Sequence, residues 1–249
     1  MKIQVPPDGQ RSRWINASGS VGTLTLARLA QTTRSLFVVV ANDSDNVYRI
    51  QNELEFFAPD LDVHSFPDQE TLPYDSMSPQ IDVISERLST LYRMPSLTHG
   101  VLVLPVRALL QKLAPTEYVQ STIFTFKQGD HFDVSARRKA LTNAGYRNVV
   151  TVYERGEYAT RGAIFDIFPV GTSRPIRIEL FDDEIETLRH FDPETQLTTE
   201  RVTSVDFLPT KEFPLNERGI SNFRNQWHRE FNVDVRDCRD YQDVSDGIA

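Results

Sequence analysis

The segment that most resembles a nucleotide site is Ala17-Ser-Gly-Ser-Val-Gly-Thr-Leu24, which precedes a predicted helix. A phosphate-binding loop follows G-x-x-x-x-G-K-[ST]: its backbone N–H groups wrap the phosphates, its lysine supplies charge, and its hydroxyl binds magnesium. In that register the four diagnostic positions hold Ala17, Gly22, Thr23 and Leu24. Because the lysine and the metal-binding hydroxyl are both missing, we expect no productive ATP binding. The segment is either a degenerate phosphate loop or an ordinary loop of no such origin.

Other side chains form no recognisable catalytic group. The acidic run Asp182-Asp183-Glu184 carries enough charge to bind a cation, but carboxylates in a predicted turn commonly serve the turn itself. The five histidines are scattered, and the single cysteine, Cys238, has neither a disulfide partner nor metal-ligand spacing around it. No Ser/His/Asp arrangement has a diagnostic context. The sequence therefore predicts no catalytic residue, no cofactor site and no metal site.

The strand predicted at Ile176–Phe181 places an aromatic residue on its polar face. Side chains alternate between the two faces of a strand. The core-facing set is Ile176, Ile178 and Leu180, and the water-facing set is Arg177, Glu179 and Phe181. Aromatic residues and arginine dominate protein-interface hot spots. Phe181 is therefore a candidate partner contact; the alternative is that a helix or loop covers it.

The first half of the chain alternates strand and helix patterns. Strands are predicted at 36–41, 62–66 and 101–104. One helix is predicted to follow a cap at Asp43 or Ser44, a second to begin at Ser78-Pro79, and a third to end near Ala114-Pro115. The continuous apolar run at 36–41 is typical of a strand buried on both faces of a parallel sheet. The apolar positions of the second helix are Ile81, Ile84, Leu88 and Leu91. This order predicts an α/β, doubly wound domain.

Residues 119–199 are predicted to form a small α+β unit. Its strands are expected at 122–127, 149–153, 163–168, 176–181 and 185–191, with a helix that stops at Gly145. We expect a strand at 202–207 to return to the first sheet, and then a helix with the apolar stripe Ile220, Phe223, Trp227 and Phe231. The acidic last dozen residues are expected to fray. The domains are thus predicted as 1–118 with 200–249, interrupted by an insert at 119–199.

Composition limits the classes of function. A net charge of −8 and a pI near 5.2 disfavour nucleic-acid binding by the chain alone. The densest basic run, Arg137-Arg138-Lys139, fits a solvated helix surface. No signal-peptide pattern and no membrane-length apolar run are present, so we expect a cytoplasmic protein that does not contact a membrane.

Four segments have a distinctive sequence: Glu70-Thr-Leu-Pro-Tyr-Asp-Ser-Met-Ser-Pro79, Ile84-Ser-Glu-Arg-Leu-Ser-Thr-Leu-Tyr92, Gly156-Glu-Tyr-Ala-Thr-Arg-Gly-Ala163 and Phe181-Asp-Asp-Glu-Ile185. They closely resemble the N-terminal region of the bacterial transcription-repair coupling factor family, and the similarity covers nearly the whole chain. That region is similar in turn to the excision-nuclease B subunit, UvrB. The resemblance implies a degenerate helicase-like, P-loop-type domain of parallel sheet with a small inserted α+β domain. Members of the family are far longer ATP-dependent DNA translocases, so this chain would be an N-terminal fragment without the motor.

The resemblance also implies roles for particular residues. In both families the inserted domain docks the excision-nuclease A subunit, UvrA, and the docking positions correspond here to Arg161, Arg177 and Phe181. ATP, magnesium, RNA polymerase and DNA would be bound by the C-terminal modules, which would mask the docking face until it is needed. The chain departs from UvrB in its phosphate loop and in lacking room for the aromatic-rich hairpin that grips damaged DNA.

Two hypotheses follow for function. The first is a non-catalytic docking module that recruits UvrA to RNA polymerase stalled at DNA damage. The alternative is an active P-loop ATPase or helicase-type DNA-repair subunit resembling UvrB.

Overall fold

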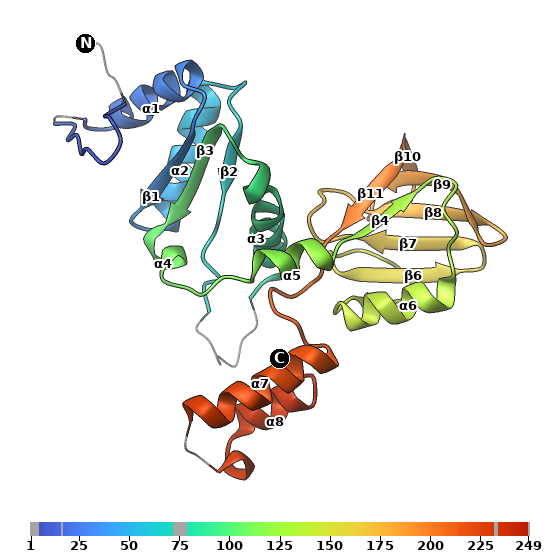
Figure 1. Cartoon of the computed structure of the whole chain (residues 1–249). Coiled ribbons are helices and arrows are strands. Elements are labelled where there is room, and N and C mark those ends of the chain that lie inside the picture. Colours follow the sequence, from blue (N-terminus) through green and yellow to red (C-terminus); the bar gives the residue numbers. More distant parts are fainter. Residues whose placement is uncertain (1–4, 16, 72–78, 232–233, 249) are drawn as a thin grey trace. The chain divides into compact units, whose positions relative to one another are not determined.

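The computed structural model describes residues 5–15, 17–71, 79–231 and 234–248. The chain forms two compact units, shown in Figure 1. The first contains residues up to Asp68 together with Arg93–Lys112, and the second contains Gln69–Tyr92 and the residues from Leu113 onward. These units are defined by which residues pack together, whereas the predicted domains describe one segment of sequence inserted within another. The boundaries 1–118, 119–199 and 200–249 therefore stay a prediction.

The first unit is an α/β structure built on a parallel sheet. Its elements are α1 (Val21–Thr32), β1 (Leu36–Ala41), α2 (Ser44–Phe57), β2 (Val63–Ser65), η1 (Met94–Ser96), β3 (Gly100–Pro105) and α4 (Val106–Leu109). The strands lie in the order β1-β3-β2, and both pairings are parallel. Asp43 caps α2, because its carboxylate accepts a hydrogen bond of 2.8 Å from the Asn46 N–H. The parallel strands and the cap agree with the sequence prediction.

The main apolar cluster of the first unit lies on one side of this sheet, although Leu102 and Leu104 of β3 are buried on the other side. Ala27 of α1, Leu54 of α2 and Val103 of β3 are buried in a single apolar cluster. The prediction that β1 is buried on both faces is wrong, since Val38 and Val40 are 55% and 48% exposed. The reason is that β1 is an edge strand, and α1 and α2 pack against only its other face.

The second unit is a mixed α/β structure built on a six-stranded sheet. Its elements are α3 (Ile81–Arg93), α5 (Thr116–Ser121), β4 (Phe124–Lys127), α6 (Val134–Asn143), β5 (Arg147–Asn148), β6 (Glu157–Arg161), β7 (Ile164–Phe168), β8 (Ile176–Phe181), β9 (Glu184–Phe191), β10 (Thr198–Val202), β11 (Ser204–Phe207), α7 (Glu217–Glu230), η2 (Val235–Asp237) and α8 (Arg239–Ser245). The strand order is β10-β9-β8-β7-β6-β5, antiparallel except for β5 beside β6. The predicted antiparallel arrangement of β7, β8 and β9 is confirmed.

The two faces of this sheet differ in character. The inner face carries the aromatic core, in which Phe165 contacts Phe132 at 5.1 Å and stacks on Tyr158 at 5.6 Å between ring centres. On the outer face, the cross-strand register aligns Ala159, Asp166, Arg177, Arg189 and Arg201. Polar residues are therefore concentrated on the outer face.

Two predicted strands differ from the structure. Residues 149–153 form no strand, because the Glu157 carboxylate accepts hydrogen bonds from the N–H groups of Tyr153 and Glu154, at 3.0 and 2.9 Å. The strand predicted at 202–207 exists as β11, but it pairs with β4 in the second unit and not with the first sheet. Aromatic packing favours this pairing: the Phe207 and Phe126 rings lie 4.7 Å apart.

The apolar stripe predicted after residue 217 lies on α7. Trp227 is buried there, and its ring lies 5.4 Å from Phe223, 4.5 Å from Phe231 and 5.6 Å from Tyr241 of α8. The predicted fraying of the last dozen residues is wrong, because α8 forms within them and contributes Tyr241 to this aromatic cluster.

Helix α3 is joined to loops of the second unit by polar bonds. Arg87 is fully buried and donates to Glu212 through Nε (2.5 Å to Oε1) and Nη2 (3.1 Å to Oε2). The Gly171 N–H donates to Ser85 Oγ at 2.8 Å. These bonds explain why α3 packs with the second unit although it follows the first unit in sequence.

The amphipathic pattern of α3 was only partly predictive. Leu88 and Leu91 are buried as expected, whereas Ile81 and Ile84 are partly exposed. The predicted cap, Ser78, lies outside the described residues, and the helix is described from Ile81.

Removal of one partner of the buried pair tests this account of α3. Arg87→Ala leaves the Glu212 carboxylate buried without its bidentate donor, so we expect the free energy of unfolding to fall by about 3–5 kcal/mol. Urea denaturation followed by circular dichroism measures it. The matched control is Arg239→Ala, which breaks the exposed pair with Asp243 and should cost less than about 0.5 kcal/mol. Equal stabilities for the two variants would contradict the assignment.

Candidate protein-binding face

Phe181 ends β8 on the outer face of the six-stranded sheet. The core-facing residues Ile176, Ile178 and Leu180 are all buried, whereas the Phe181 side chain is 69% exposed. A tight turn follows, in which Asp182 has a positive φ of 52°. Within the described residues no helix or loop covers the ring, so the alternative of a covered Phe181 is excluded for this part of the chain.

Arg161 lies at the same end of the sheet. It ends β6, opposite Ile164 of β7, and its side chain is exposed. The hairpin between them turns at Gly162, whose φ is +59°. The Leu180 N–H donates to the Ala163 carbonyl at 2.8 Å, which fixes this hairpin beside the end of β8. The structure therefore brings Arg161 and Phe181 to neighbouring positions on the outer face.

Arg177 is bound within the chain itself. Its Nε and Nη2 donate to the two carboxylate oxygens of Asp166 at 2.7 and 2.9 Å, and Nη1 donates to the Gln196 carbonyl at 3.1 Å. The guanidinium also lies 4.9 Å from the centre of the Phe191 ring. The hydrogen bond with Asp166 raises the pKa of Arg177 further. The side chain is only 16% exposed, so a bidentate pair with a partner carboxylate would require these bonds to break.

A small apolar cluster covers part of the outer face. Val152, Ala159, Phe168 and Phe191 are buried together, with Val149 against them. The segment that failed to form a strand thus folds over this region. The end of the face that carries Arg161 and Phe181 stays exposed.

The loop before α1 contacts a carboxylate. Ser20 Oγ donates to Glu53 Oε1 at 2.9 Å, and Arg49 Nη1 donates to the same oxygen at 2.9 Å. Burial raises the pKa of Glu53, but hydrogen bonds from Thr23, Ser20 and Arg49 outweigh it and hold that pKa below its usual value. The residue in the position of the missing lysine, Thr23, is therefore among the residues that hold the pKa of this carboxylate low. A negative group at this place would repel a phosphate.

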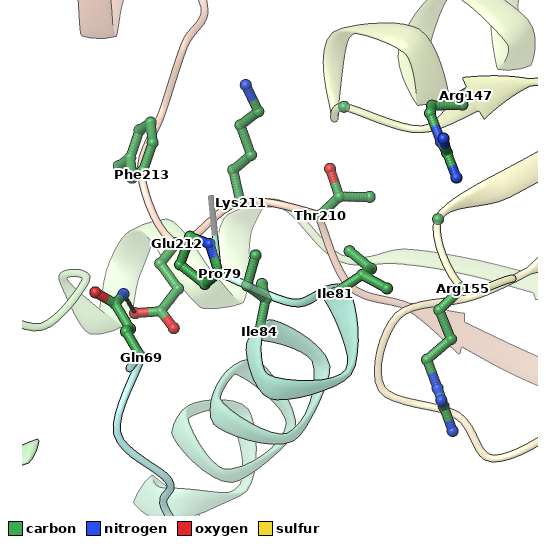
Figure 2. Close-up of a pocket in the computed structure, with 12 residues that line it drawn as sticks. Gln69, Pro79, Ile81, Ile84, Arg147, Arg155, Thr210, Lys211, Glu212 and Phe213 are labelled. Carbon is green, nitrogen blue, oxygen red and sulfur yellow. Dashed lines mark hydrogen bonds between the residues drawn. The ribbon is translucent and has the colours of Figure 1, made fainter. Parts of the chain in front are cut away.

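A cavity of about 270 Å³ lies in the second unit between the first turn of α3 and the segment 210–213 (Figure 2). Its walls include Ile81 and Ile84, and its two arginines are already bound by the chain. Arg155 donates to Asp82 and to the Thr172 carbonyl, and Arg147 donates to Glu157 at 3.1 Å. The cavity offers no unpaired arginine for an anion.

The described residues contain no group of three or more His, Cys, Asp or Glu side chains placed to hold a metal ion. None of the helices formed by them is long and apolar enough to cross a membrane.

Residues 124–213, which include Arg161, Arg177 and Phe181, match the UvrB interaction domain family. The chain is 41% identical over 230 residues to the transcription-repair-coupling factor of Escherichia coli K12. The chain is a relative of the transcription-repair coupling factors. The protein of Haemophilus influenzae is 39% identical over 93% of the chain, and that of Myxococcus xanthus 34% over 84%. The chain spans about a fifth of the length of these coupling factors, between 18% and 20%.

Several residues that shape this coupling-factor region were not found from the sequence. Asp166 is the acidic residue within the otherwise apolar strand Ile164–Phe168, and only this interruption of the apolar pattern indicated in the sequence that it has a role. Glu53 carried no signal at all, because its contact with the loop depends on how α2 packs beside α1.

Arg177→Ala should destabilise the fold as well as change the surface. It leaves the Asp166 carboxylate, 2% exposed, without its counter-ion, so the free energy of unfolding should fall by about 3–5 kcal/mol. Urea denaturation measures this, and the double variant Arg177→Met with Asp166→Leu should recover most of the loss. As a control, Arg174→Ala breaks the exposed pair with Glu200 and should change stability by less than about 1 kcal/mol. If Arg177→Ala unfolds like the parent, the pair is not structural.

Proposed function

We propose that this chain is a non-catalytic docking module that binds UvrA and recruits nucleotide-excision repair to RNA polymerase stalled at DNA damage. The observation that carries the proposal is the exposed Phe181 on a segment that matches the UvrB interaction domain. The names of the relatives, which are transcription-repair-coupling factors, support the same process.

The chemistry of the face suits a protein partner. An exposed phenylalanine can fill an apolar pocket while a neighbouring arginine forms a charge-assisted pair at the rim. Arg161 is the exposed arginine at this end, and its side chain forms no ion pair within the described residues. We assign Arg177 a positioning role: it ties β8 to β7 and to the turn at Gln196, and so fixes the strand that ends at Phe181.

The first unit fits a helicase-like domain that has lost its nucleotide site. Its parallel sheet and the segment 17–24, which runs into the first turn of α1, support this origin, and the Glu53 carboxylate supports loss of phosphate binding. We place the use of ATP and magnesium, and the contacts with RNA polymerase and DNA, in the regions of the longer coupling factors that this chain does not span. In this proposal the protein acts in the cytoplasm.

A thermal-shift measurement with ATP separates the proposal from the leading alternative, an active P-loop ATPase resembling UvrB. Under the proposal, with Thr23 and Leu24 in place of the lysine and the hydroxyl residue, millimolar ATP with magnesium should leave the melting temperature unchanged within about 1 °C. A ligand at 100 times its Kd would add about 2.7 kcal/mol to the free energy of unfolding. A concentration-dependent rise of several degrees in differential scanning fluorimetry would establish the alternative and remove the proposal of a lost site.

Phe181→Ala tests the docking proposal. We expect the affinity for purified UvrA to fall roughly 30-fold, about 2 kcal/mol, because a hot-spot aromatic is truncated. Stability should change by less than about 0.5 kcal/mol, because the side chain is 69% exposed. Isothermal titration calorimetry measures the first quantity, and urea denaturation measures the second.

The matched control is Phe56→Ala on α2, which removes an 81% exposed phenylalanine from the first unit and should leave UvrA binding unchanged. Equal affinities for the parent and Phe181→Ala would refute the proposed surface.

A further inference from the structure

Three arginines stand in one row across the outer face of the six-stranded sheet. Arg177 of β8 is directly opposite Arg189 of β9, and Arg189 is directly opposite Arg201 of β10. Asp166 of β7 is opposite Arg177 at one end of the row. We call Arg177, Arg189 and Arg201 the arginine row.

Like charges directly opposite on neighbouring strands destabilise a sheet. Arg177 is neutralised by Asp166, but both cross-strand neighbours of Arg189 are arginines. The Nε atom of Arg189 is buried and lacks a hydrogen-bond partner in the described part of the chain. Neither Arg189 nor Arg201 forms an ion pair there. The row thus retains an unfavourable arrangement that the fold does not compensate.

One carboxylate near the row has a cationic partner, because Glu200 pairs with Arg174 at 2.6 Å. Glu179 keeps its negative charge, since it accepts a hydrogen bond of 2.6 Å from the neutral Thr187 hydroxyl, and it acts on Arg177 together with Asp166. The three arginines of the row still outnumber these two carboxylates, so the row gives the outer face a small local positive charge on a chain whose net charge is −8. Like charges that face each other on neighbouring strands lower the stability of a sheet, and proteins retain such unfavourable arrangements mainly at functional sites.

We propose that the arginine row extends the docking face and binds a carboxylate-bearing segment of UvrA, the partner that is proposed to cover Phe181. This inference rests on the proposed function. Arg189 and Arg201 supply the free charge, since Arg177 is held by Asp166. Charge complementarity thus selects an acidic occupant.

The dimensions fit a single interface. Phe181 lies four residues beyond Arg177 on β8, a distance of about 13 Å at the rise of a strand. The row itself spans about 10 Å, from β8 across β9 to β10. A protein interface of ordinary size buries about 800 Å² on each partner, which covers both groups.

A nucleic acid is a less suitable occupant. The turn beside Phe181 carries Asp182, Asp183 and Glu184, and a phosphate backbone laid along the face would meet these carboxylates. An acidic protein segment can place its charges over the row and its apolar residues over Phe181.

The test compares UvrA binding by the parent, Phe181→Ala, and the double variant Arg189→Gln with Arg201→Gln. We expect the double variant to lose at least 10-fold in affinity, and its affinity to depend less on salt concentration than that of the parent. Its melting temperature should be unchanged or higher, because the opposed charges are removed. The control is Arg138→Gln with Lys139→Gln on α6, the helix whose Thr142 hydroxyl contacts Tyr158 of the inner face, and this variant should bind like the parent.

The outcomes separate the two proposals. If Phe181→Ala loses UvrA binding but the arginine double variant binds like the parent, the role of the row is wrong and the docking function stands. If the parent shows no binding to UvrA, the docking function fails and the row fails with it. If the double variant loses affinity for duplex DNA but not for UvrA, a nucleic-acid role replaces the one proposed.

Discussion

The two-residue period of β8 is the constraint on which the second unit depends. Ile176, Ile178 and Leu180 supply part of the inner core and are almost fully buried. Once they face inward, Arg177, Glu179 and Phe181 must face outward. A slip of one residue would bury Arg177 in the aromatic core and expose three aliphatic side chains. The register that holds the core is therefore also the register that presents Phe181.

The bidentate pair between Arg177 and Asp166 reinforces that register from the outer side. It joins β8 to β7, while the third nitrogen of the guanidinium holds the turn at Gln196. A docking position need not touch its partner to be required for docking. Arg177 gives the docking face a fixed framework through its pair with Asp166, whereas Arg189 and Arg201 supply the positive charge of the arginine row.

Local patterns predicted the elements well, and long-range packing accounts for the errors. Burial of β3, the start of α2 at Asp43 and the alternation of β8 each follow from residues close in sequence. The pairing of β11 with β4 joins residues about 80 positions apart, and no local period specifies it. The burial of Arg87 depends on Glu212, 125 residues away, so the helical pattern of α3 alone gave no sign of it. Residues 149–153 had strand composition, but the Glu157 carboxylate bonds the N–H group of Tyr153, at the end of that range, and the N–H group of Glu154, which follows it.

The candidate site was predictable to a similar degree. Exposure of Phe181 followed from strand alternation, whereas the pairing of Asp166 and the alignment of Arg189 and Arg201 were given only by the cross-strand register. Hydrogen–deuterium exchange of the chain with and without UvrA tests the central claim most directly, since it reports every covered segment at once. The account predicts protection at residues 161–164, 181–184 and 189–201, with no change in α1 or α2. Protection confined to the first unit, with none in the six-stranded sheet, would contradict it.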